Sequence, residues 1–217
     1  MDLTVISRNL PYLLGGLAVT LETAFLVIVG GSLFGLALGL ARSGRPSLPR
    51  LFAAGYIEII RGTPLLVVLF FVYFGIPPVI GYRFSAYEAA VLGFILFIGA
   101  YIAEDYRSGV AAVPHGQIEG GLALGLSQRQ VRYHVVLPQA VRRMIPALFN
   151  EFIRLVKFTS VASVIGVTEL TGAALSVNAR EFQPVPIIAA LAASYFVLCY
   201  ALSLAGRWLD RRYAIQA

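Results

Sequence analysis

Three long stretches of apolar residues, free of charged side chains, dominate the pattern along the chain. They are Thr23–Ala41, Gly62–Tyr82 and Phe182–Gly206, with 19, 21 and 25 residues. A helix rises about 1.5 Å per residue, so about 20 residues cross the roughly 30 Å of hydrocarbon in a bilayer. Each stretch therefore predicts a membrane-spanning helix.

Two further apolar stretches contain charges. Phe84–Ala103 is interrupted only by Glu88, whereas Gln139–Thr168 holds five charged residues: Arg142, Arg143, Glu151, Arg154 and Lys157. We interpret both as spans, which predicts an all-α integral membrane protein with about five transmembrane helices. The expected spans are approximately 13–41, 51–76, 84–106, 139–166 and 184–209, with a polar loop at 107–138, in one domain over 1–217.

The composition agrees with a membrane protein. Hydrophobic residues make up 59% of the 217 positions, charged residues only 13%, and the mean hydropathy is +0.80. The first residues do not show the basic leader, short apolar core and cleavage site of a signal peptide, which predicts that the first span is retained. Cys199 is the only cysteine, so we expect neither an internal disulfide nor a metal site.

Basic residues are distributed unevenly between the two sets of alternate loops. With five spans, eleven of the seventeen lie in 41–50, 104–143 and the tail from Arg207, and the opposite side holds only Arg8, Arg83 and Arg180. The positive-inside rule predicts that the eleven are cytoplasmic, with the N-terminus outside and the C-terminus inside. The net charge of +6 follows from this asymmetry, so a nucleic-acid partner is not expected.

The polar loop has a helical pattern of its own. Its apolar residues recur near helical spacing, which predicts two short amphipathic helices separated by a glycine-marked turn near 125–127. We expect Leu137-Pro138 to end one helix and start the next, because proline is favoured at the first helical position. This pattern fits a helix lying at the lipid headgroups and equally a helix that docks on a soluble partner.

The same loop resembles bacterial ATP-binding-cassette importer permeases. Their signature is Glu-Ala-Ala, three residues, Gly, nine residues, an aliphatic, any residue and Leu-Pro. The matching positions here are Glu119, Gly120, Gly121, Gly125, Val135, Leu137 and Pro138. The departure is Gly120-Gly121 in place of two alanines. Longer stretches, such as "RGTPLLVVLFFVYFGIP" and "LVKFTSVASVIGVTEL", are similar to the branch that takes up polar amino acids (His, Glu, Gln, Arg or opines).

This resemblance implies a type I importer permease fold in a bacterial inner membrane. The loop would form a coupling helix on a cytoplasmic ATPase, and the coupling residues would be Glu119, Gly120, Gly121, Gly125, Leu137 and Pro138. It also implies a second permease subunit, two ATPase subunits that bind ATP and Mg²⁺, and an extracytoplasmic amino-acid-binding protein. The chain has no phosphate-binding Gly-x4-Gly-Lys-Ser/Thr loop, so we expect no ATPase activity and no cofactor in it. The rival function is an ion-gradient-driven carrier or channel.

Ionisable residues within the spans are candidates for a transport path. Glu58 and Arg61 are three residues apart, as are Glu151 and Arg154, so each pair is expected to neutralise itself. Pro64 predicts a helix break just after Arg61, and the polar run from Lys157 to Ser160 predicts a second break.

Transporters place substrates at such interruptions. An amino acid needs a cation for its carboxylate and an anion or carbonyls for its ammonium group. The substrate-path candidates are Glu58, Arg61, Thr63, Lys157, Thr159 and Ser160, with a purely structural role as the alternative. Relatives in the family often have Asp after the lysine. This chain has Phe158, so a preference for cationic amino acids does not follow.

Overall fold

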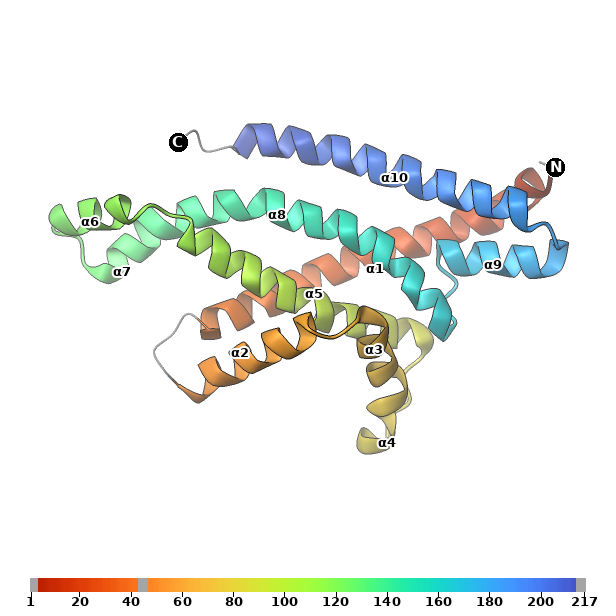
Figure 1. Ribbon diagram of the computed structural model, residues 1–217, viewed down its shortest axis with the longest axis horizontal. Coiled ribbons are helices and arrows are strands. Elements are labelled where there is room, and N and C mark those ends of the chain that lie inside the picture. Colours follow the sequence, from red (N-terminus) through yellow and green to blue (C-terminus); the bar gives the residue numbers. More distant parts are fainter. Residues whose placement is uncertain (1–3, 43–46, 214–217) are drawn as a thin grey trace.

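Four long helices run side by side along the length of the molecule. The computed structural model describes residues 4–42 and 47–213, and no strand occurs among them. The long helices are α1 (Thr4–Arg42), α5 (Ala86–Ala111), α8 (Leu137–Phe158) and α10 (Pro184–Tyr213). Figure 1 shows that all four extend along the long axis and that α1 and α5 cross near its middle. The all-α architecture expected from the sequence is confirmed.

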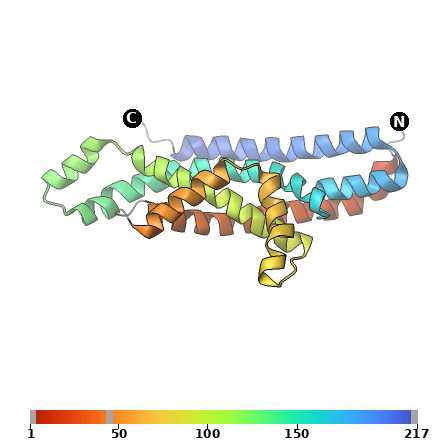
Figure 2. The ribbon, with the colours of Figure 1, turned by 60° about the horizontal axis from the view of Figure 1, so that its bottom comes forward.

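The segment expected as the second span is sharply bent. It forms α2 (Leu48–Arg61), α3 (Leu65–Phe70), a π-helical turn η1 (Phe71–Gly75) and α4 (Pro77–Ile80), with a bend of 113° between Arg61 and Leu65. Pro64 lacks an amide hydrogen and has extended backbone angles (φ −59°, ψ 139°), so the helix stops before it. As a result the chain turns away from α2, with α3 packed on the body and α4 at the tip of a projecting arm (Figures 1 and 2).

The polar loop is helical almost throughout. It contains α6 (His115–Ala123), α7 (Gln128–Val131) and a π-helical turn η2 (Arg132–Val136) that leads directly into α8. As expected, α8 begins at Leu137 with Pro138 in its first turn, but the preceding helical turn does not end in an interruption there. Leu137 keeps helical angles (φ −61°, ψ −44°), and the Gln139 side chain donates to the Val135 carbonyl (3.1 Å) in the turn before the proline. The helical path therefore continues through this point.

The last part of the chain bends after α8 and reverses direction only after one further helix (Figure 1). A 3₁₀ segment η3 (Thr159–Ile165) follows, then α9 (Leu170–Glu181), bent by 46° from the preceding helix. Glu169 caps α9: its carboxylate accepts from the amides of Thr171 (3.0 Å) and Gly172 (2.9 Å). Tyr195 of α10 also donates to Glu169 (3.0 Å). This buried carboxylate therefore fixes α9 against α10.

Within residues 4–42 and 47–213, three helices are by themselves long and apolar enough to cross a membrane. They are Thr4–Arg42, Ala86–Ala111 and Pro184–Leu209, and the number rises to five if each of the two bent pairs forms one span. The first helix begins at Thr4, nine residues before the start expected at 13. Its polar first turns, with Ser7, Arg8 and Asn9, conceal this extension in a search for apolar stretches.

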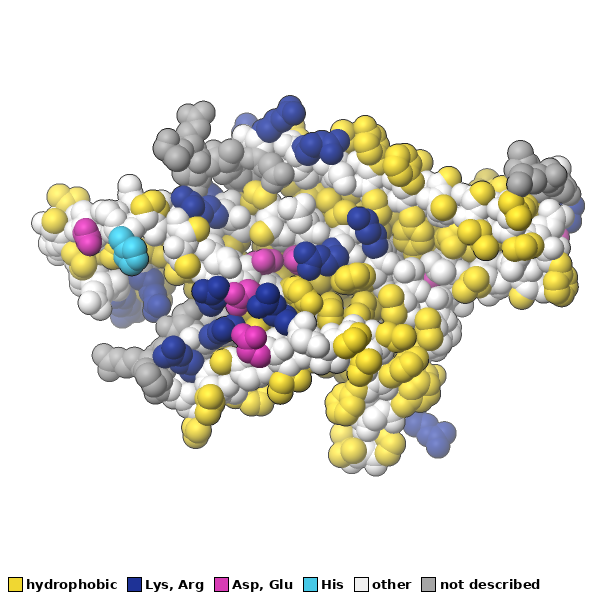
Figure 3. All heavy atoms as spheres, in the orientation of Figure 1, with side chains coloured by type: hydrophobic (Ala, Val, Ile, Leu, Met, Phe, Trp, Pro, Cys, Tyr) yellow, Lys and Arg dark blue, Asp and Glu magenta, His cyan; other side chains and the backbone are white. Residues whose placement is uncertain are grey.

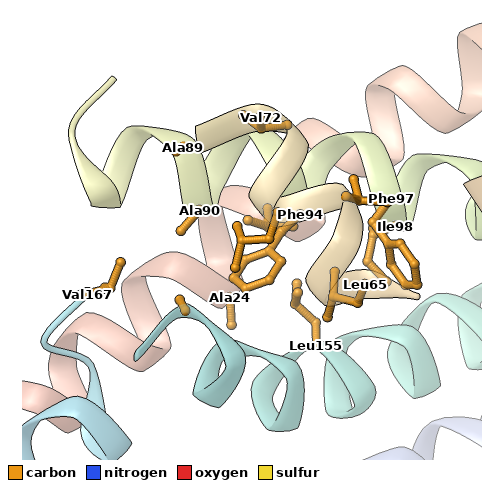
Figure 4. Close-up of a cluster of buried hydrophobic side chains, with 14 of the residues drawn as sticks. Ala24, Leu65, Val72, Ala89, Ala90, Phe94, Phe97, Ile98, Leu155 and Val167 are labelled. Atoms are coloured by element: carbon orange, nitrogen blue, oxygen red, sulfur yellow. The ribbon is translucent and has the colours of Figure 1, made fainter. Parts of the chain in front are cut away.

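The core lies where α1, α3, α5, α8 and η3 meet. Phe94 and Ile98 of α5 are almost fully buried and lie with Ala24 of α1, Leu65 of α3 and Leu155 of α8 (Figure 4). Small residues allow α1 and α5 to approach closely. A methyl group on Gly35 would come within 2.7 Å of the Gly99 carbonyl oxygen, a backbone atom. These contacts make α1 and α5 the rigid centre of the molecule.

Candidate functional site: a projecting helical hairpin and a charged cluster

The α6–α7 hairpin projects beyond the helical body and has a small core of its own. Figures 1 and 2 place it at the end of the molecule opposite the N-terminus. Three valines are buried there, Val113, Val131 and Val136. They pack against the partly buried Val110, Ile118, Leu126 and Val135. The apolar residues that gave the loop its helical pattern thus hold the hairpin together, and the exposed positions remain free for a partner.

The turn of the hairpin depends on Gly125. Its φ is +82°, a left-handed conformation that favours glycine, and its amide donates to the Leu122 carbonyl (3.0 Å). The Leu126 amide then donates to Gly121 (3.2 Å). Ser127 and Gln130 form a capping box that starts α7. The glycine-marked turn expected at 125–127 is confirmed.

The two glycines that replace the family's alanines differ in their surroundings. Gly120 is exposed, and a methyl group there would meet nothing within 4 Å. Gly121 is buried, and a methyl group there would lie 2.9 Å from a methyl carbon of Val131. Gly121 therefore sets how closely α6 and α7 approach, whereas Gly120 has no packing role within this chain.

The outer surface of the hairpin mixes apolar and charged groups. Leu124 is 85% exposed at the tip, and Tyr133 is also exposed, with the Arg129 guanidinium over its ring (5.8 Å). Glu119 is exposed on α6. Pro138 and Leu137 lie farther along, at the start of α8. An exposed leucine and an aromatic–arginine pair are typical of a protein interface.

A cluster of charged side chains joins α1, α2 and α5. Its centre is Glu104, which accepts from Arg42 (3.0 Å) and Arg107 (2.6 Å) and lies 3.8 Å from Arg61. The Glu58–Arg61 pair expected from the sequence is wrong, because Glu58 pairs with Arg42 instead (3.3 Å). Figure 3 shows these basic and acidic groups gathered on one face of the molecule. Arg61 is thus directed toward α5.

Tyr101 of α5 lies between two arginines. The guanidinium of Arg61 on α2 is 5.7 Å from its ring centroid and that of Arg154 on α8 is 5.4 Å. Both distances are within the range of cation–π attraction. Arg154 also pairs with Glu151 (3.2 Å), as expected from their spacing. One aromatic ring therefore brings together the cations of two elements far apart in the sequence.

Two carboxylates beside this cluster have an oxygen without a hydrogen-bond partner. They are Asp105 on α5 and Glu151 on α8, which is only 4% exposed. The sequence analysis missed Tyr101, Glu104 and Asp105, because the two acids were counted among the loop charges. Their helical spacing near the end of an apolar stretch was the available signal. Buried carboxylates with spare acceptor capacity can bind a cationic group.

The substrate-path candidates at the second helix break, from Lys157 to Ser160, lie apart from the charged cluster. Lys157 is exposed and lines a groove of about 370 Å³ with five residues of α10: Tyr195, Phe196, Cys199, Tyr200 and Ser203. Thr159 is fully buried and donates to the Val156 carbonyl (2.8 Å), and Ser160 donates to Lys157 (2.7 Å). Thr63 likewise donates to Ile59 (2.7 Å). The three hydroxyls cap their own helices, and Arg61 and Lys157 face different neighbours.

Phe158 has a packing role. Its ring lies edge-on to Phe97 of α5, with the centroids 6.1 Å apart. The position where family members often have an acid is therefore part of an apolar contact.

Apolar spans, helix breaks lined by polar groups and a projecting helical hairpin define a membrane transport subunit of the type I importer permease fold. The chain belongs to the family of binding-protein-dependent transport system inner membrane components, whose model matches residues 31–215.

Named relatives are similar over nearly the whole chain. The probable amino-acid ABC transporter permease YckA of Bacillus subtilis is 38% identical over 207 residues, covering 95% of this chain and 91% of that protein. The glutamine transport system permease GlnP of Escherichia coli is 39% identical, with coverage of 99% and 98%. The L-cystine permease TcyB of B. subtilis is 37% identical, with coverage of 93% and 86%.

Solved structures agree with this family. The crystal structure of an amino acid ABC transporter with histidines contains a chain that is 34% identical, with a TM-score of 0.94 and coverage of 98% of this chain and 99% of that one. A chain of the inward-facing methionine transporter MetNI has a TM-score of 0.77 at 19% identity, with coverage of 95% and 98%. At that identity the second likeness shows the fold alone.

We predict that Glu104→Gln destabilises the protein more than Glu58→Gln. Glu104 is 18% exposed and faces three arginines, so its neutralisation leaves cations without their acceptor and costs about 1–3 kcal/mol. Glu58 is 67% exposed and has one partner, so its loss costs less than about 1 kcal/mol. Thermal unfolding in detergent compares the two variants, and equal melting temperatures would contradict the central position of Glu104.

Proposed function

We propose that this chain is the permease subunit of an ATP-driven bacterial amino acid importer. The α6–α7 hairpin carries this proposal, because its closed core and its exposed leucine, tyrosine and arginine suit a docking element for a soluble subunit. The family, and relatives named as amino acid, glutamine and cystine permeases, support the same function. They give no support to the alternative of an ion-gradient-driven carrier.

The proposed assembly has two permease subunits, two ATPase subunits and an extracytoplasmic binding protein. ATP and Mg²⁺ are held by the ATPases, so this chain is not itself an enzyme. Its one membrane domain lies in the inner membrane, with the hairpin and C-terminus cytoplasmic and the N-terminus outside. This orientation rests on the excess of basic residues in the loops on the hairpin's side.

ATP-driven closure of the ATPases moves the hairpins and switches the spans between outward- and inward-facing states. The hairpin suits this role because η2 joins it to α8 without an interruption of the helical path. A continuous helix passes a displacement on as a rigid body. The coupling residues are those of the signature: Glu119, Gly120, Gly121, Gly125, Leu137 and Pro138.

We place the substrate path beside the break after Arg61. Arg61 offers a cation for the substrate carboxylate, and Asp105 and Glu151 have free acceptor oxygens for its ammonium group. The remaining candidates, Glu58, Thr63, Lys157, Thr159 and Ser160, border the breaks. Because Lys157 faces α10, its contribution comes from a separate surface.

The function is tested in vesicles reconstituted with the permease, its ATPase and its binding protein. We expect amino acid to accumulate only when ATP is present on the side of the membrane that carries the ATPase and the binding protein is present on the opposite side. Omission of the ATPase gives the matched control. Accumulation driven by a sodium or proton gradient without ATPase would instead identify a secondary carrier.

We predict that Gly121→Ala impairs coupling and Gly120→Ala does not. The new methyl group at 121 meets the side chain of Val131, which is stiff because it is β-branched, so α6 must shift. Uptake should fall several-fold while ATPase activity persists, and Val131→Ala in the same chain should restore it. Equal uptake by the two glycine variants would contradict this role of Gly121.

We predict that Arg61→Ala lowers uptake more than tenfold at unchanged membrane abundance. Arg107→Ala is the matched control, because Arg107 also pairs with Glu104 but has no contact with Tyr101 among the described interactions. Lys157→Ala should show a smaller loss, since Lys157 faces a different groove. Similar losses in Arg61→Ala and Arg107→Ala would assign Arg61 a structural role only.

A further inference from the structure

The corner between α9 and α10 is made by a strained aromatic residue. Phe182 follows Glu181 with φ 52° and ψ 36°, and it is the only non-glycine residue with positive φ among the residues described. Its amide donates to the Asn178 carbonyl (2.9 Å) and so ends α9. Glycine or asparagine usually occupies this position, because a bulky side chain is disfavoured there.

The fold itself gives no reason for a phenylalanine at this corner. Its side chain is 83% exposed, so packing within the chain does not compensate for the strain. Glycine would end α9 with the same backbone hydrogen bond and without the steric conflict. Residues held in unfavourable backbone conformations often serve function.

The corner is held rigidly by the elements below it. Val5 of α1, Val177 of α9 and Ile187 of α10 are buried together in a separate apolar cluster. Glu181 is bound by Asn9 (3.1 Å) and lies 3.6 Å from Arg8. The direction in which Phe182 projects is therefore fixed before any partner arrives.

The position of the corner identifies the side of the membrane that it faces. Figures 1 and 2 show it at the end of the molecule opposite α6, close to the start of α1. The polar Arg8, Asn9 and Glu181 surround its base, which places this level outside the hydrocarbon. With the hairpin in the cytoplasm, Phe182 faces the extracytoplasmic space.

Two basic side chains lie close to this corner: Arg8 pairs with Glu181, and Arg180 precedes Phe182 by two residues. Arg8 is 66% exposed, and Arg180 is exposed with its guanidinium 5.0 Å from the ring of Tyr12. Glu181, the acid between them, is already bound by Arg8 and Asn9. A rigid aromatic anchor with arginines beside it is typical of a protein–protein contact. A lipid headgroup would accept an aromatic ring in any backbone conformation, and so would not require the strained one.

We propose that the corner at Phe182, with Arg8 and Arg180, is a docking point for the extracytoplasmic binding protein. The facing surface of that protein would present an apolar recess bordered by acidic side chains. This inference rests on the proposed function and adds the place of contact.

The test measures ATPase activity of the complete complex in nanodiscs, titrated with its amino-acid-loaded binding protein. We expect Phe182→Gly and Phe182→Asn to raise the half-maximal concentration of binding protein at least fivefold, with basal ATPase activity unchanged. Phe182→Leu, which keeps an apolar side chain, should raise it less. The melting temperature of Phe182→Gly should equal or exceed that of the wild type, because the strain is removed.

Phe25→Ala is the control, since Phe25 is 62% exposed in the middle of α1 and should leave the titration unchanged. An unchanged half-maximal concentration in Phe182→Gly would overturn the docking role. So would a loss of stability in Phe182→Gly that occurs only with anionic lipid, because that outcome identifies a lipid anchor. A wild-type complex that does not respond to loaded binding protein would overturn the proposed function itself, and the inference with it.

Discussion

The constraint on which this structure depends is that no backbone polar group can remain unpaired in hydrocarbon. Helices satisfy it along most of the chain, and short polar side chains satisfy it where the helices break. Thr63 donates to the carbonyl of Ile59, and Thr159 to that of Val156. The carboxylate of Glu169 accepts from the first amides of α9. Hydroxyl and carboxylate side chains thus satisfy backbone groups at the bends of a chain whose composition otherwise favours straight helices.

Most charged groups in this part of the molecule are also paired within the chain. Arg42, Arg61 and Arg107 all lie near the single carboxylate of Glu104, and Arg61 and Arg154 approach one tyrosine ring. These contacts join α1, α2, α5 and α8 on the side of the molecule nearer the hairpin. Asp105 and Glu151 beside them keep acceptor oxygens free. A cluster that is paired overall but has free acceptors can hold the helices together and still receive a cationic group.

Periodicity and composition predicted the helical architecture and the two-helix form of the loop, because apolar faces and glycine turns are local properties. Local spacing did not predict the ion pairs whose partners are distant in the sequence. Glu58 and Arg61 are three residues apart, yet each finds a partner on another helix. The side that Lys157 faces, and the meeting of Arg61 with Arg154 on Tyr101, depend on how helices pack. The strain at Phe182 leaves no signal in apolar or charge patterning.

The hairpin is connected to the charged cluster through α8. α7 continues through η2 into α8, which carries Glu151, Arg154 and Lys157. Beyond η3 the chain reaches Glu169, which is fixed to α10 by Tyr195. Gly121 determines how α6 rests on α7, so a force applied to the hairpin acts on α8 through close side-chain contact. One helix therefore links the surface suited to a soluble partner with the cations beside the proposed substrate path, and its far end leads to α9.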